Sequence, residues 1–150
     1  TETVVQDPRA YVRLVRSVWV PTAQEAALEE GTRARARSAD AIENYAVGGR
    51  ALALVAARRL DTYDGNRAEV TTWTAGFSWG PRERPGQRWF LTETSLRWDG
   101  QRWRVEKMDE AKRPAPAPAR VGYDDQVSLK SETFDRELRG MTAPTYGDAR

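Results

Sequence analysis

A pair of tryptophan-bearing segments around a short turn constrains the fold of this chain more than any other feature. Residues 96–105 read Leu-Arg-Trp-Asp-Gly-Gln-Arg-Trp-Arg-Val, and Asp99 and Gly100 tolerate the backbone angles of a tight turn. A turn of this kind between apolar segments predicts a β-hairpin. Because tryptophan-rich hairpins serve first to pack a small sheet, this feature predicts a scaffold more clearly than a reaction.

The hairpin ends a longer run of strand signals, which begins where the apolar period changes at residue 50. Turn-forming residues such as Asp64 separate alternating segments, and Trp73 and Phe77 fall on one face of the second segment. Arg58 breaks the alternation of the first segment, which favours a β-bulge. We expect an antiparallel meander of strands at 50–63, 67–79, 87–98 and 102–109, with a polar loop at 80–86.

Three amphipathic segments precede the strands. Asp7 followed by Pro8 is typical of a helix start, and apolar residues then recur at helical spacing. Gly31 ends or weakens the second segment, and we interpret the three alternating arginines after it as a solvated connection. We expect helices at about 7–20, 22–31 and 38–47. The fold class is therefore α+β, with N-terminal helices packed on a curved four-stranded antiparallel meander.

Alternating proline and alanine at 114–118 mark the edge of the domain, because this composition favours an extended, semi-rigid spacer. We expect a helix-plus-sheet domain at 1–112, a linker at 113–120 and a C-terminal tail at 121–150. The tail has apolar residues for one short helix, among them Phe134 and Leu138. Docking of the tail and partial disorder both stay open.

Composition excludes several kinds of chemistry. The 150 residues contain no cysteine and no histidine, which removes thiolate and imidazole nucleophiles, histidine-assisted serine catalysis and nearly every zinc site. We expect no cofactor and no metal. Of the 24 basic residues 21 are arginine, which reflects either codon composition or a basic binding face. No apolar run approaches the roughly 20 residues of a membrane span.

Two groups of carboxylates are candidates for acid–base chemistry. Glu93 lies in the middle of a predicted strand, where burial would raise its pKa, but an outward side chain paired with an arginine such as Arg97 is the favoured interpretation. Asp61, Tyr63 and Asp64 cluster at the first hairpin without the ligand spacing of a calcium loop. We expect a turn solvated by its own polar side chains.

Two other functions remain as alternatives. A cone-fold enzyme or small-ligand binder would use an apolar pocket lined by Tyr45, Trp73, Phe77 and Trp89. A single-stranded nucleic-acid binder would use the tryptophans and arginines of the sheet, because bases stack on aromatic rings in a basic groove. We favour the packing role for the tryptophans and regard nucleic acid as the less favoured partner.

Two stretches of the sequence resemble a known group of proteins. Residues 63–74, Tyr-Asp-Gly-Asn-Arg-Ala-Glu-Val-Thr-Thr-Trp-Thr, and the hairpin at 96–105 are similar to motifs of extracytoplasmic domains from actinobacterial membrane proteins linked to conjugation. These domains have the cone-shaped, cystatin-like fold of nuclear-transport-factor-two-like proteins. They are related in fold to the bitopic scaffold subunit of type IV secretion systems. The proline-rich exit also fits, and the resemblance covers roughly residues 50–119.

The resemblance implies a non-enzymatic assembly or scaffold domain of a conjugative transfer or type IV secretion-like membrane apparatus. It implies self-association, contacts with other subunits of the apparatus, and a place on the extracytoplasmic side of the cell membrane. We expect the single-pass anchor to lie upstream of Thr1. The candidate protein-interaction residues are on the first helix, the 80–86 loop and the tail: Arg9, Arg13, Arg16, Arg82, Arg84, Phe134 and Leu138.

Overall fold

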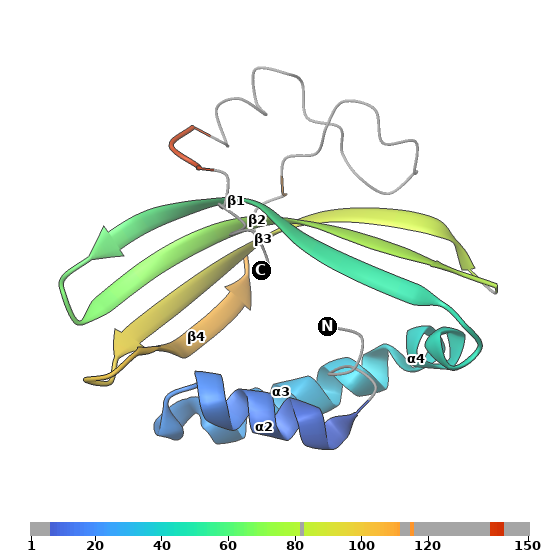
Figure 1. Cartoon of the computed structure of the whole chain (residues 1–150), viewed down its shortest axis with the longest axis horizontal. Helices are drawn as coiled ribbons and strands as arrows, with labels where there is room; N and C mark the ends of the chain where they lie inside the picture. The colour runs from blue at the N-terminus through green and yellow to red at the C-terminus, as the bar shows by residue number, and fades with distance from the viewer. Residues whose placement is uncertain (1–6, 82, 112–114, 116–138, 143–150) are drawn as a thin grey trace, which may run out of the picture.

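A computed structural model describes residues 7–81, 83–111, 115 and 139–142. The helices come first and the strands follow, as Figure 1 shows. Their bounds are α2 (Pro8–Val18), the 3-10 helix η1 (Pro21–Ala23), α3 (Gln24–Arg37), α4 (Ala39–Ala46), β1 (Arg50–Tyr63), β2 (Arg67–Gly80), β3 (Glu83–Trp98) and β4 (Trp103–Glu110). The sheet is an open antiparallel meander in the order β1-β2-β3-β4. The predicted α+β class is confirmed.

The first helix begins as its sequence predicts, whereas the second one does not end where expected. Asp7 accepts a hydrogen bond from the backbone N–H of Arg9 at 2.8 Å, with Pro8 in the first helical turn. Helix α3 continues through Gly31 to Arg37. A Cβ on Gly31 would lie 2.2 Å from Cε1 of Tyr11, so this glycine lets α2 and α3 approach closely.

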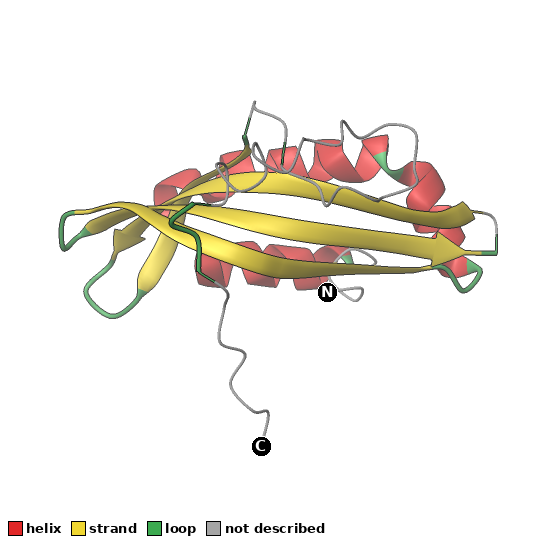
Figure 2. Ribbon diagram, turned by 90° about the horizontal axis from the view of Figure 1, so that it is seen from above, coloured by secondary structure: helices red, strands yellow, loops and turns green. Residues whose placement is uncertain are grey.

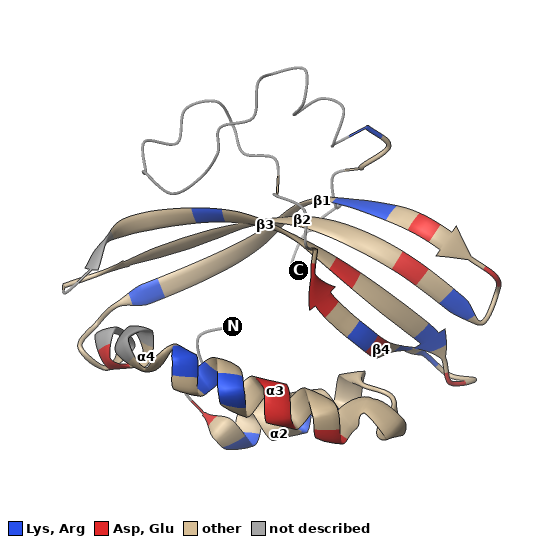
Figure 3. Cartoon of the chain, turned by 180° about the vertical axis from the view of Figure 1, so that it is seen from behind, with Lys and Arg blue, Asp and Glu red and all other residues tan. Residues whose placement is uncertain are grey.

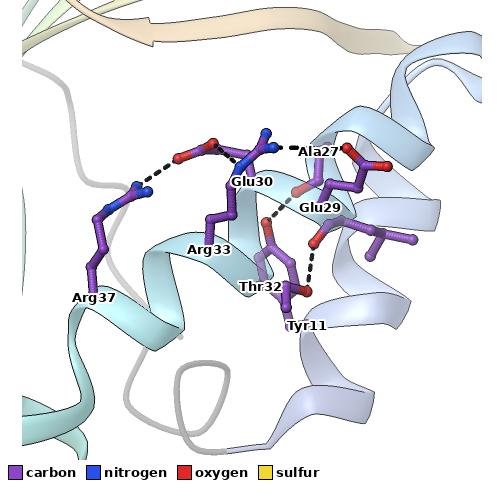
Figure 4. Close-up of polar contacts among 8 residues, drawn as sticks. Tyr11, Ala27, Glu29, Glu30, Thr32, Arg33 and Arg37 are labelled. Atoms are coloured by element: carbon purple, nitrogen blue, oxygen red, sulfur yellow. Dashed lines mark hydrogen bonds and ion pairs between the residues drawn. The ribbon is translucent and has the colours of Figure 1, made fainter.

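The arginines after Gly31 belong to α3 and are not a connection, contrary to the prediction. Arg33 pairs with Glu29 and Glu30, and Arg37 donates a hydrogen bond to Glu30 at 2.6 Å (Figure 4). Such pairs one or two turns apart stabilise the exposed side of a helix, which explains how an arginine-rich segment remains helical.

The strands match the predicted bounds closely, except at the start of β3. Residues 83–86 were expected in a loop, but they belong to β3 and pair with the end of β2, with Ser78 opposite Gly86. Two bulges interrupt β1, one between Val55 and Ala57 and one between Leu60 and Thr62, so the predicted irregularity near Arg58 is present on both sides of that residue.

The sheet has two unlike halves because β4 is short. Strand β4 pairs with β3 only from Thr92 to Trp98. The four-stranded half therefore contains residues 57–63, 67–73, 91–98 and 103–110, and the three-stranded half contains 50–55, 74–80 and 83–90. The strong twist of the sheet is visible where these halves meet in Figure 1.

The two faces of the sheet also differ. Ala57, Trp73 and Leu91 are buried together on one face, and Ala115 and Met141 pack against them. The segment 139–142 lies along the outer edge of β1, which Figure 1 shows away from the helices. The helices lie beneath the opposite face in the view of Figure 2.

The helices are attached to the sheet through β4. The backbone N–H of Val20 donates to the carbonyl oxygen of Val105 at 2.9 Å, and Arg104 Nη1 donates to the carbonyl oxygen of Ser17 at 3.0 Å. Trp19 forms a parallel bridge with Val105. Val15 and Val105 are both almost completely buried in this region. The helical layer is therefore fixed to the four-stranded half.

The linker expected at 113–120 and the tail expected at 121–150 lie outside the described residues, except for Ala115 and 139–142. In the latter segment, Thr142 pairs with Arg58 on the outer edge of β1. Their two backbone hydrogen bonds measure 2.9 and 2.8 Å. At least this part of the predicted tail therefore contacts the domain.

Candidate functional site: an apolar patch and an adjacent groove

An exposed apolar patch lies on the three-stranded half of the sheet. We define the patch by Leu52, Leu54, Phe77 and Trp79. Leu52 lies opposite Phe77 in the β1–β2 register, and Leu54 and Trp79 lie on the same face two positions away along their strands. The exposed fractions of Leu52, Leu54 and Trp79 are 43%, 44% and 43%. Neighbouring large apolar side chains that stay this exposed are typical of a contact surface.

Charge is distributed unevenly over the same sheet. Figure 3 shows few charged residues on the part of the sheet near α4, and many of both signs toward the opposite end. There, Arg97 pairs with Glu106 and Arg104 pairs with Asp99. The patch is therefore in the less charged part of the sheet that the structure describes, with Arg50 opposite Trp79 on the same face.

A groove of about 920 Å³ lies beside β1, across the sheet from the tryptophan core. Its floor is formed by Val55, Leu60, Val70, Thr72 and Leu96, which the register places on one face of β1, β2 and β3. Gly140 and Thr142 complete the rim along the edge of β1. The side chain of Leu60 is 60% exposed, so much of its apolar surface is open to solvent.

Two arginines line this groove, and their surroundings differ. Arg59 donates to Asp61 at 2.6 Å, and Asp61 also accepts from the hydroxyl of Thr71 at 2.6 Å. Burial raises the pKa of Asp61, but the hydrogen bonds from Thr71 and Arg59 outweigh it, so the pKa lies below its ordinary value. Among the described residues no carboxylate pairs with Arg58. The groove therefore has one uncompensated positive charge.

A smaller groove of about 440 Å³ lies among α2, α3 and α4, next to Tyr11 and Gly31. The hydroxyl of Tyr11 donates to the carbonyl oxygen of Ala27 at 3.0 Å (Figure 4). Partial burial, with a smaller contribution from the negative charge of Glu30, raises the pKa of Tyr11. This tyrosine is thus a neutral structural contact between helices.

The residues proposed for an internal pocket are only partly brought together. Trp73 and Trp89 stack with ring centroids 4.4 Å apart, on the face that Ala115 and Met141 cover. Trp73, Trp89 and Phe77 are absent from the linings of both grooves. Tyr45 belongs to α4, a different layer, and its side chain lies outside the described part of the structure.

The candidate interaction residues do not form one surface in the described part of the chain. Arg9, Arg13 and Arg16 are exposed on α2, and Arg13 lies 3.6 Å from Asp7. Arg84 belongs to β3, but its side chain is not among those described. Arg82, Phe134 and Leu138 lie outside the described residues.

The carboxylates considered for acid–base chemistry lie in structural contacts. Asp64 accepts hydrogen bonds from the backbone N–H groups of Asn66 and Arg67, so the first hairpin is a turn stabilised by its own side chain, as expected. Glu93 is exposed and lies opposite Thr71 and Asp109. Its expected partner Arg97 instead pairs with Glu106, which lies within reach on the neighbouring strand.

The described residues contain no group of three or more side chains suited to hold a metal ion. None of the helices in the described part of the chain is long and apolar enough to cross a bilayer. The sequence alone gives no signal that Leu52, Leu54 and Trp79 share a patch, because the pairing of β1 with β2 brings them together. The sequence marks Arg58 only by its break in the alternation of apolar and polar residues along β1.

Comparison with known proteins identifies no family. No family model matches the chain, and no curated protein matches it. Among solved structures, the intermembrane space region of the chloroplast protein ARC6 is similar to 73% of this chain and 84% of its own length, with 13% identity and a TM-score of 0.41.

Proposed function

We propose that this chain is a non-catalytic assembly domain that binds another protein subunit through the patch of Leu52, Leu54, Phe77 and Trp79. The observation that carries the proposal is the exposure of Leu52, Leu54 and Trp79 on one face of the sheet. Burying such side chains in a protein contact would stabilise the complex by about 25 cal/mol for each Å² of apolar surface. Leucine and tryptophan side chains together suit the apolar centre of an interface.

The apparatus that we propose for this domain is a conjugative transfer or type IV secretion-like complex on the extracytoplasmic side of a cell membrane. Support for the apparatus comes from the motifs at 63–74 and 96–105, which resemble those of conjugation-linked domains. The partner surface would be another subunit or a second copy of the chain.

The test replaces Leu52 with Asp and Trp79 with Ser in the full-length gene, in the cell that naturally carries it. We expect self-association or subunit capture to fall at least tenfold, since charge at the centre of an apolar contact is poorly tolerated. DNA transfer should fall with it. Association is measured by sedimentation of the purified protein and by cross-linking in cells.

The matched control is Thr62→Asp, which adds the same charge to β1 at an exposed position in the four-stranded half. Circular dichroism establishes that each variant is folded. Unchanged association in a folded Leu52→Asp/Trp79→Ser variant would refute the assembly function of the patch. Loss of association without any effect on DNA transfer or secretion would refute the proposed apparatus.

A further inference from the structure

The groove beside β1 has the dimensions and lining of a small-molecule site. Its volume of about 920 Å³ falls within the range of roughly 300–1,000 Å³ that is usual for such sites. The lining extends along β1 from Ala53 to Leu60, and from Leu60 across Val70 to Leu96 on β3. At about 3.3 Å per residue, the part along β1 has a length of roughly 20 Å. A long, narrow apolar ligand therefore fits better than a compact one.

The polar groups of the groove are concentrated at the arginines. Arg59 is neutralised by Asp61, at 2.6 Å. Arg58 is exposed and no carboxylate of the described residues pairs with it. The backbone N–H and C=O groups of Arg58 are both hydrogen-bonded to Thr142, which fixes the position of this residue at the rim. The charge available to a ligand is thus a single guanidinium beside an apolar floor.

We propose that this groove binds a long-chain fatty acid, with the acyl chain along Leu60, Val70 and Leu96 and the carboxylate on the guanidinium of Arg58. The carboxylate of a fatty acid matches the positive charge of Arg58, which no carboxylate of the described residues pairs with. Its acyl chain matches the elongated apolar floor. A guanidinium binds a carboxylate through two parallel hydrogen bonds, which fixes the orientation of the ligand. Leu54 of the patch also lines the groove at the edge of β1. Leu60, Val70 and Leu96 lie on the opposite face of the sheet from Leu52 and Trp79, so the two proposed sites have separate centres.

The test is a titration of the purified chain with oleate below its micelle concentration, followed by calorimetry and native mass spectrometry. Oleyl alcohol, which has the same chain without the charge, is the comparison ligand. We expect saturable binding of one oleate per chain. Arg58→Gln should weaken oleate roughly tenfold, since it removes a charge-assisted hydrogen bond at an exposed rim, and should leave oleyl alcohol unchanged.

Leu60→Glu should abolish binding of both ligands, because it puts a negative charge on the exposed part of the floor. Arg58→Lys should restore part of the oleate affinity. Arg102→Gln, which removes an exposed arginine at the β3–β4 turn, is the control and should change nothing. Circular dichroism confirms that the variants fold.

Three results would overturn the proposal: no saturable oleate binding by the native chain, equal oleate affinity of the native and Arg58→Gln proteins, or equal affinity for oleate and oleyl alcohol. Saturable binding of an acidic peptide in place of oleate would assign the groove to a protein partner. None of these results depends on Leu52 or Trp79. Failure of the fatty-acid proposal therefore does not refute the assembly function, which the Leu52→Asp/Trp79→Ser variant tests separately.

Discussion

The two halves of the sheet share the strands β1, β2 and β3 but differ in the exposure of their apolar side chains. In the four-stranded half, Trp73 and Leu91 are 8% and 2% exposed, and β4 joins this half to the helices through Val105. In the three-stranded half, Leu52 and Trp79 are both 43% exposed, and Figure 3 shows few charged residues in this part of the sheet. The contrast separates two roles along the strands: buried side chains such as Leu91 stabilise the fold, and exposed ones such as Leu52 and Trp79 are available for binding.

The largest expected effect tests that separation with one substitution in each half. Leu91→Ala should lower the free energy of unfolding by about 2–5 kcal/mol, because it leaves a cavity in the core. Leu52→Ala should change it by less than about 0.5 kcal/mol, because the side chain is already largely exposed. Urea unfolding measures both values. Similar losses for the two variants would show that the three-stranded half is also a core region.

A second prediction concerns the helices, which are joined to the four-stranded half through β4. Gly31→Ala should destabilise the protein by roughly 1–3 kcal/mol, because the new methyl group displaces the ring of Tyr11 and breaks its hydrogen bond to Ala27. This loss exceeds the gain of about 1 kcal/mol in helix propensity. Hydrogen exchange should quicken at the amide of Val20 and stay unchanged in the three-stranded half.

The control for this prediction removes the aromatic ring of Tyr11 instead of the space beside Gly31. In a Tyr11→Leu background, Gly31→Ala should no longer destabilise the protein, and the propensity gain should make it neutral or stabilising. A loss of the same size in both backgrounds would show that the contact with Tyr11 does not explain the glycine.

The smallest expected effect is a pH dependence confined to the β3–β4 turn. Hydrogen bonds from Arg104, then from the backbone N–H groups of Arg102 and Gln101, lower the pKa of Asp99 to about 2 from 3.8. Because the folded pKa is the lower one, the contribution of Asp99 is complete above about pH 4 and is lost as the pH falls toward 2. NMR titration of the carboxyl group measures this.

The sharper form of this experiment compares the native chain with Arg104→Gln. The pKa of Asp99 should rise toward its ordinary value in the variant, and the amide signals of the three-stranded half should not titrate with it. An unchanged pKa would show that Arg104 is not the main cause of the shift.

Features set by local chemistry could be predicted from the sequence. The turns at Asp64 and Asp99 are stabilised by their own side chains and neighbouring backbone, so the strands around them were placed almost to the residue. The cap at Asp7 was equally local. The α+β class followed, because three helical periods precede four alternating segments.

Features set by contacts between distant residues could not be predicted. Gly31 has the signature of a helix end, but its neighbour in space is Tyr11, twenty residues earlier. Alternation separates the two faces of a strand without indicating which face the helices will cover. The groove depends on strand register and on the segment near Thr142 at the edge of β1, so Arg58 was recognised only as an irregularity.

The short reach of β4 has a further consequence for how the chain behaves at high concentration. It leaves the outer edge of β3 from Glu83 to Phe90 without a neighbouring strand among the described residues. An open edge of this kind can recruit strands from other molecules and seed aggregation. Pro85 lacks a backbone N–H, and Arg88 adds an exposed charge, so both discourage such pairing. Strand pairing between molecules at this edge is thereby disfavoured.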